Sequence, residues 1–349
     1  VATLFDSKGP EIRFRLFEGG KVTINDGDLF TLTTKEVLGN NTIGSISYKN
    51  LINDVQIGTS ILVNDGLIEL KVEKVGDTDI VCRVINGGVI SDRKAINVPG
   101  VHLSLPFLSD VDRRDLEFAM KTGFDFFALS FVRCAEDVLE VRRLQKEHNN
   151  TSKLIAKIES QEGVENLDAI IDVADGIMVA RGDMGVEIPF EKVPVVQKDM
   201  ISKCLKSGKF VIVATQMLES MTHNPRPTRA EVNDVANAIF DQTSAVMLSG
   251  ESAAGDYPVE AVKTMSRICH EIEKTTTTGK FEITYNGSNL ASSIACAACS
   301  IASIINADAI IPVSLSGSTI RKVSGFRPNI DIIGCSTNER VLCRFAARP

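Results

Sequence analysis

The middle of this chain alternates apolar, strand-like runs with helix-patterned stretches, and every run ends at a polar or charged residue. Parallel strands joined by helical crossovers produce this alternation. In (β/α) barrels, polar groups at the carboxyl ends of the strands carry the chemistry. Ser, Thr and Asp also cap helices, but five polar ends in register favour a populated active face. The runs are Asp125 to Phe131 with Ser130, Leu154 to Glu159, Gly176 to Arg181 leading into Asp183, Phe210 to Thr215, and Ala245 to Ser249 leading into Glu251.

The stretches between these runs have the apolar periodicity of helices. With residues 2–6 as a further strand, six barrel strands are recognisable, whereas a closed barrel of this type has eight. An open barrel edge invites aggregation. We therefore expect either that the sequence is part of a longer chain or that the protein is an unusual fragment. The predicted helices span residues 110–122, 136–148, 163–173, 195–207, 229–240 and 258–273.

The pattern changes between the first strand and the remaining barrel units. Residues 11–97 contain short alternating strands separated by EGG, NDGD, NDG, VGD and NGG, which are hairpin signals and predict a small all-β insert. A polar stretch from Thr275 to Ser288 is interpreted as a linker before another α/β layer. The predicted segments are residues 1–10 and 98–275 for the barrel, 11–97 for the insert and 276–349 for the partial C-terminal α/β domain.

Composition excludes several classes of function. A formal charge of −7, 5% aromatic residues and no Trp argue against a nucleic-acid-binding face, which would be basic. The absence of an apolar run long enough to span a bilayer, and of a leading signal, indicates a soluble, cytoplasmic protein without a membrane partner.

The spacing of the cysteines and histidines does not indicate a metal site. The eight cysteines lie mostly within strand or helix patterns, which favours free thiols in a reducing compartment. Cys296 and Cys299 form a C-x-x-C within an Ala-rich helical run, where helix packing is favoured over zinc binding because no second pair is present. The four histidines are scattered, without ligand spacing.

Lys157 and Glu159 are the most informative polar pair. They are two residues apart on a predicted strand, so both side chains point to the same face. Their neighbours Leu154, Ile155 and Ile158 are apolar, which fits a site at a buried strand end better than a surface ion pair.

Asp183 adds a second carboxylate at the end of the next strand. Two carboxylates without His or Cys suit a hard cation, and Mg²⁺ is the leading candidate. Lys157, Arg13, Lys94 and Arg181 would supply positive charge for a phosphate-bearing substrate, although each alone is compatible with a solvated surface. Asp183 could equally cap a helical turn.

Thr215 also lies at a strand end. An unperturbed hydroxyl is a weak acid, so a proton-transfer role would require a water relay; helix capping is the alternative.

Long motifs in this chain strongly resemble the pyruvate kinase family. They are DSKGPEIR from Asp6, NVPG from Asn97, LSFVR from Leu129, KIESQEG from Lys157, DGIMVARGDMGVEIP from Asp175, ATQMLESM from Ala214, RPTRAEVNDVANA from Arg226 and LSGESAAGDYP from Leu248. The resemblance implies a TIM barrel that carries a mobile β-barrel lid between its third strand and third helix, and a C-terminal regulatory domain. It also implies phosphoryl transfer from phosphoenolpyruvate to ADP, giving pyruvate and ATP in glycolysis, usually by a homotetramer.

The resemblance assigns roles to individual residues. It implies Mg²⁺ or Mn²⁺ at Glu159 and Asp183, K⁺ at Asp6 and the Ser7 carbonyl, and nucleotide phosphate at Arg13 and Lys94. Lys157, Thr215 and Arg181 are the implied catalytic residues. The substrate pocket would comprise Lys157, Gly182, Asp183, Thr215, Ser130 and Phe131. Because Glu11 follows Pro10 where the potassium-independent branch has Lys, we expect potassium dependence.

Two further features leave alternatives open. SLSGSTIRK places Ser316, Gly317, Ser318 and Thr319 before a predicted helix, where backbone N–H groups could hold an effector phosphate or could simply be capped. A magnesium-dependent barrel lyase would share the acidic site but would leave the insert and Lys94 unexplained. A binding-only homologue is the other alternative, against which the presence of Lys157, Glu159, Asp183 and Thr215 argues.

Overall fold

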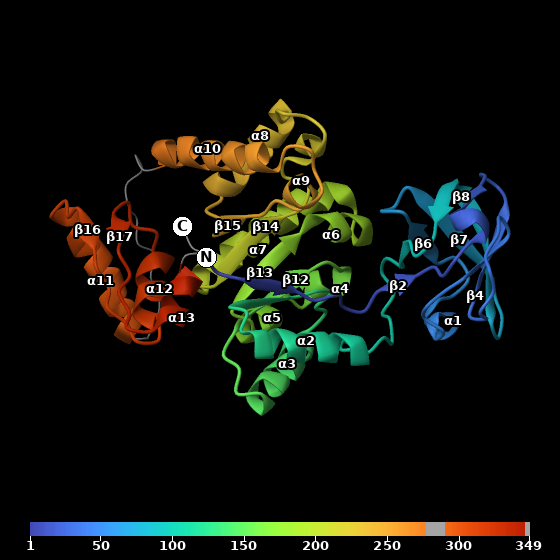
Figure 1. The fold of residues 1–349 in the computed structure, drawn as a ribbon, viewed down its shortest axis with the longest axis horizontal. Coiled ribbons are helices and arrows are strands. Elements are labelled where there is room, and N and C mark those ends of the chain that lie inside the picture. The colour runs from blue at the N-terminus through green and yellow to red at the C-terminus, as the bar shows by residue number, and fades with distance from the viewer. Residues whose placement is uncertain (277–289, 346–349) are drawn as a thin grey trace.

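A computed structural model describes residues 1–276 and 290–345 of the chain, and its centre is a parallel six-stranded sheet. The sheet order is β1-β11-β12-β13-β14-β15, and each strand pairs in parallel with the next. Figure 1 shows the sheet curled, with helices around it. All six predicted barrel strands are confirmed. They are β1 (Leu4–Asp6), β11 (Phe126–Leu129), β12 (Lys153–Ile158), β13 (Gly176–Ala180), β14 (Phe210–Ala214) and β15 (Ala245–Val246).

Helices follow the strands as the periodicity predicted. The structure has α2 (Asp110–Thr122), α3 (Ala135–Glu147), α4 (Gln161–Glu165), α5 (Leu167–Val173), α6 (Arg181–Glu187), α7 (Val193–Lys206), α8 (Arg229–Phe240), α9 (Gly250–Ala253) and α10 (Pro258–Thr276). Short 3₁₀ turns, η2 (Phe190–Lys192) and η3 (Glu219–Thr222), complete the barrel. The single helix predicted over residues 163–173 is instead two, because Asn166 leaves helical geometry and its side chain donates to the Arg133 carbonyl.

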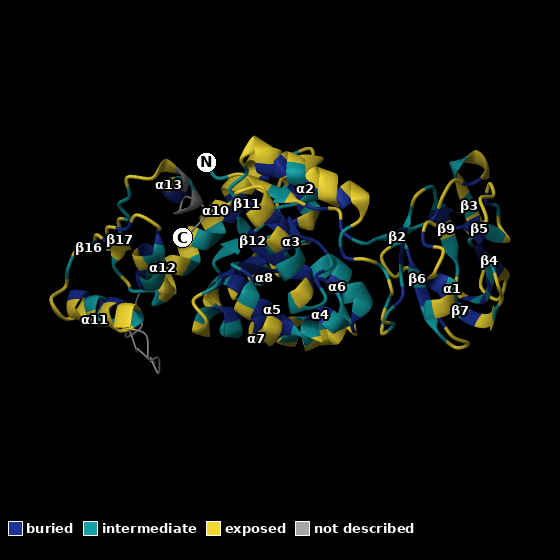
Figure 2. Cartoon of the chain, turned by 90° about the horizontal axis from the view of Figure 1, so that it is seen from below, coloured by how far each residue is buried: buried dark blue, intermediate teal, exposed yellow. Residues whose placement is uncertain are grey.

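The two faces of the sheet differ in what they pack against. Leu154, Ala156 and Ile158 of β12 belong to the large core between sheet and helices. Ile155 lies in a smaller cluster on the opposite face with Met178 and residues of β11 and β14, and Figure 2 shows these central strands buried. Since side chains alternate along a strand, Lys157 and Glu159 lie on the face of Ile155, inside the curve of the sheet.

Strands β2 to β10 form a separate unit, here called the β lobe, which projects from one end of the barrel (Figure 1). Its larger sheet has the order β2-β10-β6-β7-β8-β4-β5, and β3 pairs with β9. The hairpin-rich prediction is confirmed, although the lobe also contains a one-turn helix. Its elements are β2 (Ile12–Arg13), η1 (Glu18–Gly20), β3 (Lys21–Ile24), β4 (Leu29–Thr33), β5 (Ile43–Ser45), α1 (Leu51–Asp54), β6 (Ser60–Val63), β7 (Ile68–Val75), β8 (Asp79–Asn86), β9 (Gly88–Ser91) and β10 (Ala95–Asn97).

The C-terminal α/β layer is smaller than the sequence suggested. The strands expected over residues 309–315 and 331–336 shorten to two residues each, and beyond them only the Val313–Cys335 bridge continues the pairing. Its elements are α11 (Leu290–Ile304), β16 (Ala309–Ile310), α12 (Ser318–Gly325), β17 (Asp331–Ile332) and α13 (Glu339–Phe345). Most of the predicted linker, residues 277–288, lies outside the described residues.

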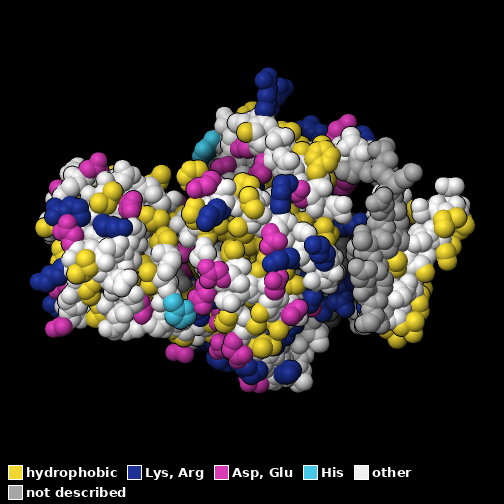
Figure 3. Space-filling view, turned by 180° about the vertical axis from the view of Figure 1, so that it is seen from behind, with side chains coloured by type: hydrophobic (Ala, Val, Ile, Leu, Met, Phe, Trp, Pro, Cys, Tyr) yellow, Lys and Arg dark blue, Asp and Glu magenta, His cyan; other side chains and the backbone are white. Residues whose placement is uncertain are grey.

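Three predictions from composition can be compared with the structure. All eight cysteines are free, and Cys296 and Cys299 lie within α11 as expected. Over residues 1–276 and 290–345, every helix is too short or too polar to cross a membrane. On the face shown in Figure 3, Lys and Arg side chains are interspersed with Asp and Glu.

Candidate active site

The carboxyl ends of β1, β11 and β12 bring Asp6, Ser130 and Lys157 together. Lys157 Nζ lies 3.1 Å from Asp6 Oδ1 and 2.8 Å from Ser130 Oγ. Ser130 Oγ is also 3.2 Å from Asp6 Oδ1 and 2.6 Å from the Ser7 carbonyl oxygen. These strands are adjacent in the sheet, so Asp6 meets Ser130 and Lys157 although they lie 124 and 151 positions further along the sequence.

Lys157 and Glu159 form an ion pair inside the barrel mouth. Lys157 Nζ is 3.2 Å from Glu159 Oε1, and the two side chains are only 14% and 1% exposed. Burial alone would lower the pKa of Lys157, but the carboxylates of Glu159 and Asp6 outweigh it and raise that pKa. The lysine is therefore a fixed cation at neutral pH.

Glu159 and Asp183 are two carboxyls in a poorly solvated place. Burial raises the pKa of Glu159 to about 7 despite the opposing charge of Lys157, and Asp183 adds to the rise. Burial also raises the pKa of Asp183, with Lys157 opposing and Glu11 and Asp65 contributing. A divalent cation would relieve the repulsion between these carboxyls, and one or two carboxylates suffice for Mg²⁺ when water and substrate supply the other ligands. The donor set fits such an ion.

A cluster of three or more His, Cys, Asp or Glu side chains suited to a metal is absent from the described part of the chain. The Glu159 carboxylate is additionally fixed by the Phe131 N–H, which donates to Glu159 Oε2 at 2.5 Å.

Thr215 and Gly182 meet where β13 and β14 end. The Gly182 N–H donates to Thr215 Oγ1 at 2.8 Å, and that hydroxyl donates to the Ala214 carbonyl at 2.6 Å. Thr215 has φ of 68° and Gln216 has φ of 54°. Side-chain-bearing residues seldom adopt this left-handed region, and β-branched residues least of all. The turn is therefore strained and must be held by its surroundings.

Arg181 supplies part of that support. Its Nη1 donates to both carboxylate oxygens of Asp234, at 2.8 and 2.7 Å, while Nη2 donates to the Thr215 carbonyl at 2.6 Å. Its Nε donates to the Ala214 carbonyl at 3.2 Å, and the side chain is 12% exposed. The guanidinium therefore holds the Thr215 turn in place, an arrangement that sequence reasoning missed because Asp234 lies 53 residues away.

Two other carboxyl groups had no role assigned from the sequence, although Glu251 was recognised at a strand end. Glu251 is fully buried and accepts from the backbone N–H groups of Leu218 and Ser249 at 2.9 and 2.7 Å, which ties the loops after β14 and β15 together. Glu187 of α6 accepts from the Asn97 amide at 3.0 Å, linking the barrel to the β lobe. Their motifs, LSGESA and ARGDMGVE, were visible, but their partners are not local in sequence.

The two predicted nucleotide-binding residues of the β lobe have different surroundings. Arg13 donates to both Glu11 carboxylate oxygens, at 2.7 and 3.0 Å, and to the Arg93 carbonyl at 2.8 Å. Glu11 and, to a smaller extent, Asp183 raise the pKa of Arg13 and outweigh burial, which would lower it. Lys94 immediately precedes β10 and is partly buried. A cavity of about 480 Å³ lies between lobe and barrel and is lined by Glu11, Asn97, Phe131, Asp183 and Glu187 among others.

The predicted effector turn lies in the C-terminal layer. Gly317 has φ of 78° and precedes α12, and the Ser318 N–H donates to Ser316 Oγ at 3.4 Å. Thr319 is in the first turn of that helix. The structure thus places these residues at a helix start, on an element separate from the barrel mouth (Figure 1).

Taken together, the curled parallel sheet and the paired Lys157 and Glu159 at its carboxyl edge define an α/β-barrel protein with a charged, poorly solvated barrel mouth. Residues 1–262 match the family model described as pyruvate kinase, barrel domain, and residues 292–348 match that described as pyruvate kinase, alpha/beta domain. The chain belongs to the pyruvate kinase family, the phosphotransferases that transfer the phosphoryl group of phosphoenolpyruvate to ADP.

Individual relatives agree with the family match. A pyruvate kinase of Clostridium perfringens is 50% identical over 98% of this chain and 73% of its own length. Pyruvate kinases of Clostridium acetobutylicum and Geobacillus stearothermophilus are each 47% identical over 99% of this chain, which spans 74% and 60% of those proteins. The crystal structure of a pyruvate kinase from Cryptosporidium parvum has a TM-score of 0.92 and 42% identity, covering 100% of this chain and 73% of that one.

Proposed function

We propose that this protein transfers the phosphoryl group of phosphoenolpyruvate to ADP at the barrel mouth, as a cytoplasmic enzyme of glycolysis with Mg²⁺ (or Mn²⁺) and K⁺ as cofactors. The observation that carries the proposal is the buried group formed by Lys157, Glu159 and Asp183 at the ends of β12 and β13. Phosphoryl transfer requires mainly positioning and charge neutralisation, which this group provides without a covalent nucleophile.

Glu159 and Asp183 would hold the divalent ion, which when bound would help neutralise the phosphate and the developing enolate. Lys157 supplies a fixed positive charge beside them. Because its ammonium already contacts Glu159 and Asp6, it can turn toward a substrate oxygen without leaving the site. Such a preorganised charge in a water-poor pocket stabilises a transition state more effectively than it would in water.

The pyruvate end of the substrate would lie over β13 and β14. The Gly182 N–H, Asp183 and Thr215 would contact it there, with Ser130 and Phe131 completing the wall. The Thr215 hydroxyl is engaged by the Gly182 N–H and the Ala214 carbonyl, so proton delivery to the enolate carbon would pass through water held by that hydroxyl. Arg181 acts on this step by holding the Thr215 turn.

The nucleotide would approach from the β lobe. Arg13 lies on β2 and Lys94 immediately precedes β10, and their positive charges would meet the phosphates of ADP. When the lobe closes, water would be excluded and hydrolysis of the phosphoryl donor limited.

The monovalent cation would bind beside Lys157. Asp6 Oδ1 and the Ser7 carbonyl oxygen both lie within hydrogen-bond reach of Ser130 Oγ, so two oxygens converge as an oxygen-liganded cation requires. Glu11, which is paired with Arg13, leaves the position without the ammonium that would replace potassium.

Family membership alone supports three further proposals. The protein would assemble as a homotetramer. It would divide into a barrel of residues 1–10 and 98–275, a lid of residues 11–97 and a C-terminal layer of residues 276–349. The turn of Ser316, Gly317, Ser318 and Thr319 would bind the phosphate of an effector, and calorimetric titrations without heat for any sugar phosphate would contradict that last proposal.

The direct test of function is pyruvate formation from phosphoenolpyruvate and ADP with Mg²⁺, on protein whose intact mass has been measured. Turnover that requires both Mg²⁺ and ADP supports the proposal. Binding of Mn²⁺ and phosphoenolpyruvate without turnover would instead identify a binding-only homologue and overturn it.

A further inference from the structure

The segment that returns the chain from the β lobe to the barrel is held at both sides. This return segment, residues 98–108, joins β10 to the loop before α2. On the lobe side, Asp54 accepts from the Ser104 N–H at 3.0 Å and also from the Ser104 hydroxyl. Asn50 donates to Ser104 Oγ at 3.0 Å. Ser104 is thus fixed to the end of α1.

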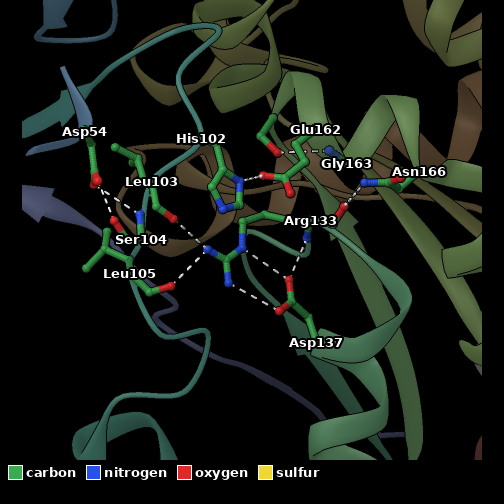
Figure 4. A network of polar contacts seen from close by, with 11 residues as sticks. Asp54, His102, Leu103, Ser104, Leu105, Arg133, Asp137, Glu162, Gly163 and Asn166 are labelled. Carbon is green, nitrogen blue, oxygen red and sulfur yellow. Dashed lines mark hydrogen bonds and ion pairs between the residues drawn. The ribbon is translucent and has the colours of Figure 1, made fainter. Parts of the chain in front are cut away.

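On the barrel side, the side chain of Arg133 binds the same segment on both flanks of Ser104. Its Nη1 donates to the Leu105 carbonyl at 2.9 Å and to the Leu103 carbonyl at 3.3 Å. Figure 4 shows the guanidinium between the return segment and α3, with Asp137 on its other side. One cation therefore holds two carbonyls of a segment without regular secondary structure, which only a forked donor can do well.

Asp137 fixes the orientation of that guanidinium. It accepts from Arg133 Nε and Nη2, each at 3.3 Å, and from the Arg133 backbone N–H at 2.9 Å. The two side chains are 17% and 8% exposed. A partly buried ion pair with several hydrogen bonds stabilises a protein more than a surface pair does, and it holds the arginine side chain in one rotamer. By contrast, the nearby contact of His102 with Glu162 is largely exposed and contributes little.

The backbone on which Arg133 sits also reaches the candidate metal ligands. Two residues earlier, Phe131 has φ of 55° and donates its N–H to Glu159. Between them, the Val132 N–H donates to the Lys157 carbonyl at 3.3 Å. The Arg133 carbonyl accepts from Asn166 at 3.0 Å. The short segment 131–133 therefore contacts Glu159 at one end and the return segment at the other.

We propose that Arg133 is a positioning residue that sets where the β lobe sits over the barrel mouth, by clamping the return segment to the backbone that holds Glu159. The inference rests on the proposed function only in its kinetic consequences, since the clamp itself is a structural claim. Its loss loosens the lobe, so Arg13 and Lys94 meet the nucleotide less often while the carboxylates on the barrel floor stay in place. Turnover and the KM for ADP then change, and metal binding does not.

The test is Arg133→Lys in the full-length protein, because lysine keeps the charge beside Asp137 but lacks the fork. The matched control is Arg143→Lys on α3, the helix that follows Arg133, where the arginine is exposed and pairs with the exposed Glu136. Hydrogen exchange in peptides covering residues 98–108 should speed up by about tenfold in Arg133→Lys and stay unchanged in the control. The kcat should fall by about tenfold and the KM for ADP should rise, while Mn²⁺ affinity without nucleotide changes by less than about twofold.

The outcomes separate the two claims. Exchange rates equal to those of the control would overturn the clamp, and an equally large loss of Mn²⁺ affinity would show a disturbed metal site instead of a positioning role. Wild-type protein without turnover would overturn the proposed function, while the exchange measurement would still decide the clamp. If Arg133→Lys does not fold, Asp137→Asn frees the guanidinium, and exchange in residues 98–108 should then rise by about threefold; no rise would equally overturn the proposal.

Discussion

The ammonium of Lys157 lies 3.2 Å from the carboxylate of Glu159, two positions further along the same strand, with both side chains inside the curve of the sheet. This geometry leaves a cation and a buried carboxylate, the proposed ligand of the divalent ion, side by side in a place that water barely reaches. Charge stabilisation in such a place depends on the fixed charge itself and not on packing.

Replacing Lys157 by Met should therefore lower the rate of phosphoryl transfer by about 100-fold or more, the usual consequence of losing one charge-stabilising group. The measurement is kcat for pyruvate formation at saturating Mg²⁺. Lys153→Met is the control, since Lys153 lies on the same strand but pairs with Asp175 at 3.0 Å; it should alter stability and leave kcat within about twofold. A loss below tenfold for Lys157→Met would remove Lys157 from the mechanism.

The second prediction concerns the strained turn at Thr215. Asp234→Asn removes the charge that holds Arg181 against the Thr215 carbonyl, so the turn should relax toward an ordinary backbone conformation. We expect kcat to fall by about tenfold with little change in the KM for phosphoenolpyruvate, as for a group that acts on the chemical step.

The control for that variant is Asp241→Asn, because Asp241 caps the end of the same helix and pairs with the exposed Lys198. If both variants lose activity equally, the effect comes from α8 and not from the Thr215 turn.

Potassium dependence is a third prediction. When K⁺ is replaced by tetramethylammonium at equal ionic strength, turnover should fall to a small fraction, because the large cation cannot fit between Asp6 and the Ser7 carbonyl. Glu11→Lys should restore part of the rate without K⁺, since its ammonium would supply the missing charge. Equal rates of the wild-type protein in both salts would contradict the proposed monovalent site.

Features set by local sequence were predictable. Helices α2 and α8 have the predicted bounds because each begins with a capping box, Ser109 with Asp112 and Thr228 with Glu231, which fixes the first turn. The shared face of Lys157 and Glu159 follows from the two-residue period of a strand. These are relationships between residues only a few positions apart.

Features set by distant partners were not predictable from the pattern. Helix α6 begins at Arg181, directly after β13 and without a separating turn, so no turn or capping residue in the sequence marks where the helix starts. Arg181 binds Asp234 of α8, and Arg133 binds the carbonyls of Leu103 and Leu105 in the return segment. These partners come close to the two arginines only in the folded protein. The C-terminal strands are shorter than the pattern predicts: Ile311 and Val313 are apolar but largely exposed, and beyond β16 and β17 the pairing is reduced to the isolated Val313–Cys335 bridge.

The last prediction concerns how stability depends on pH at the amino-terminal end of the barrel, opposite the site. Asp175 is 16% exposed and binds Arg142, Lys153 and the Leu154 N–H. Burial by itself would raise the pKa of Asp175, but Arg142, Lys153 and the hydrogen bonds outweigh it and lower that pKa. The unfolded chain therefore binds this proton more readily than the native protein does, and the carboxylate stabilises the fold above its unfolded pKa.

Asp175→Asn should accordingly lower the free energy of unfolding near neutral pH by about 2 to 3 kcal/mol, because two partly buried cations lose their counter-charge. The difference between wild type and variant should shrink as the pH falls below about 4, through the lowered native pKa, since the wild-type carboxyl then becomes neutral as well. Urea unfolding at both pH values measures it. A difference that is independent of pH would mean that packing and hydrogen bonds, and not the carboxylate charge, hold this end of the barrel.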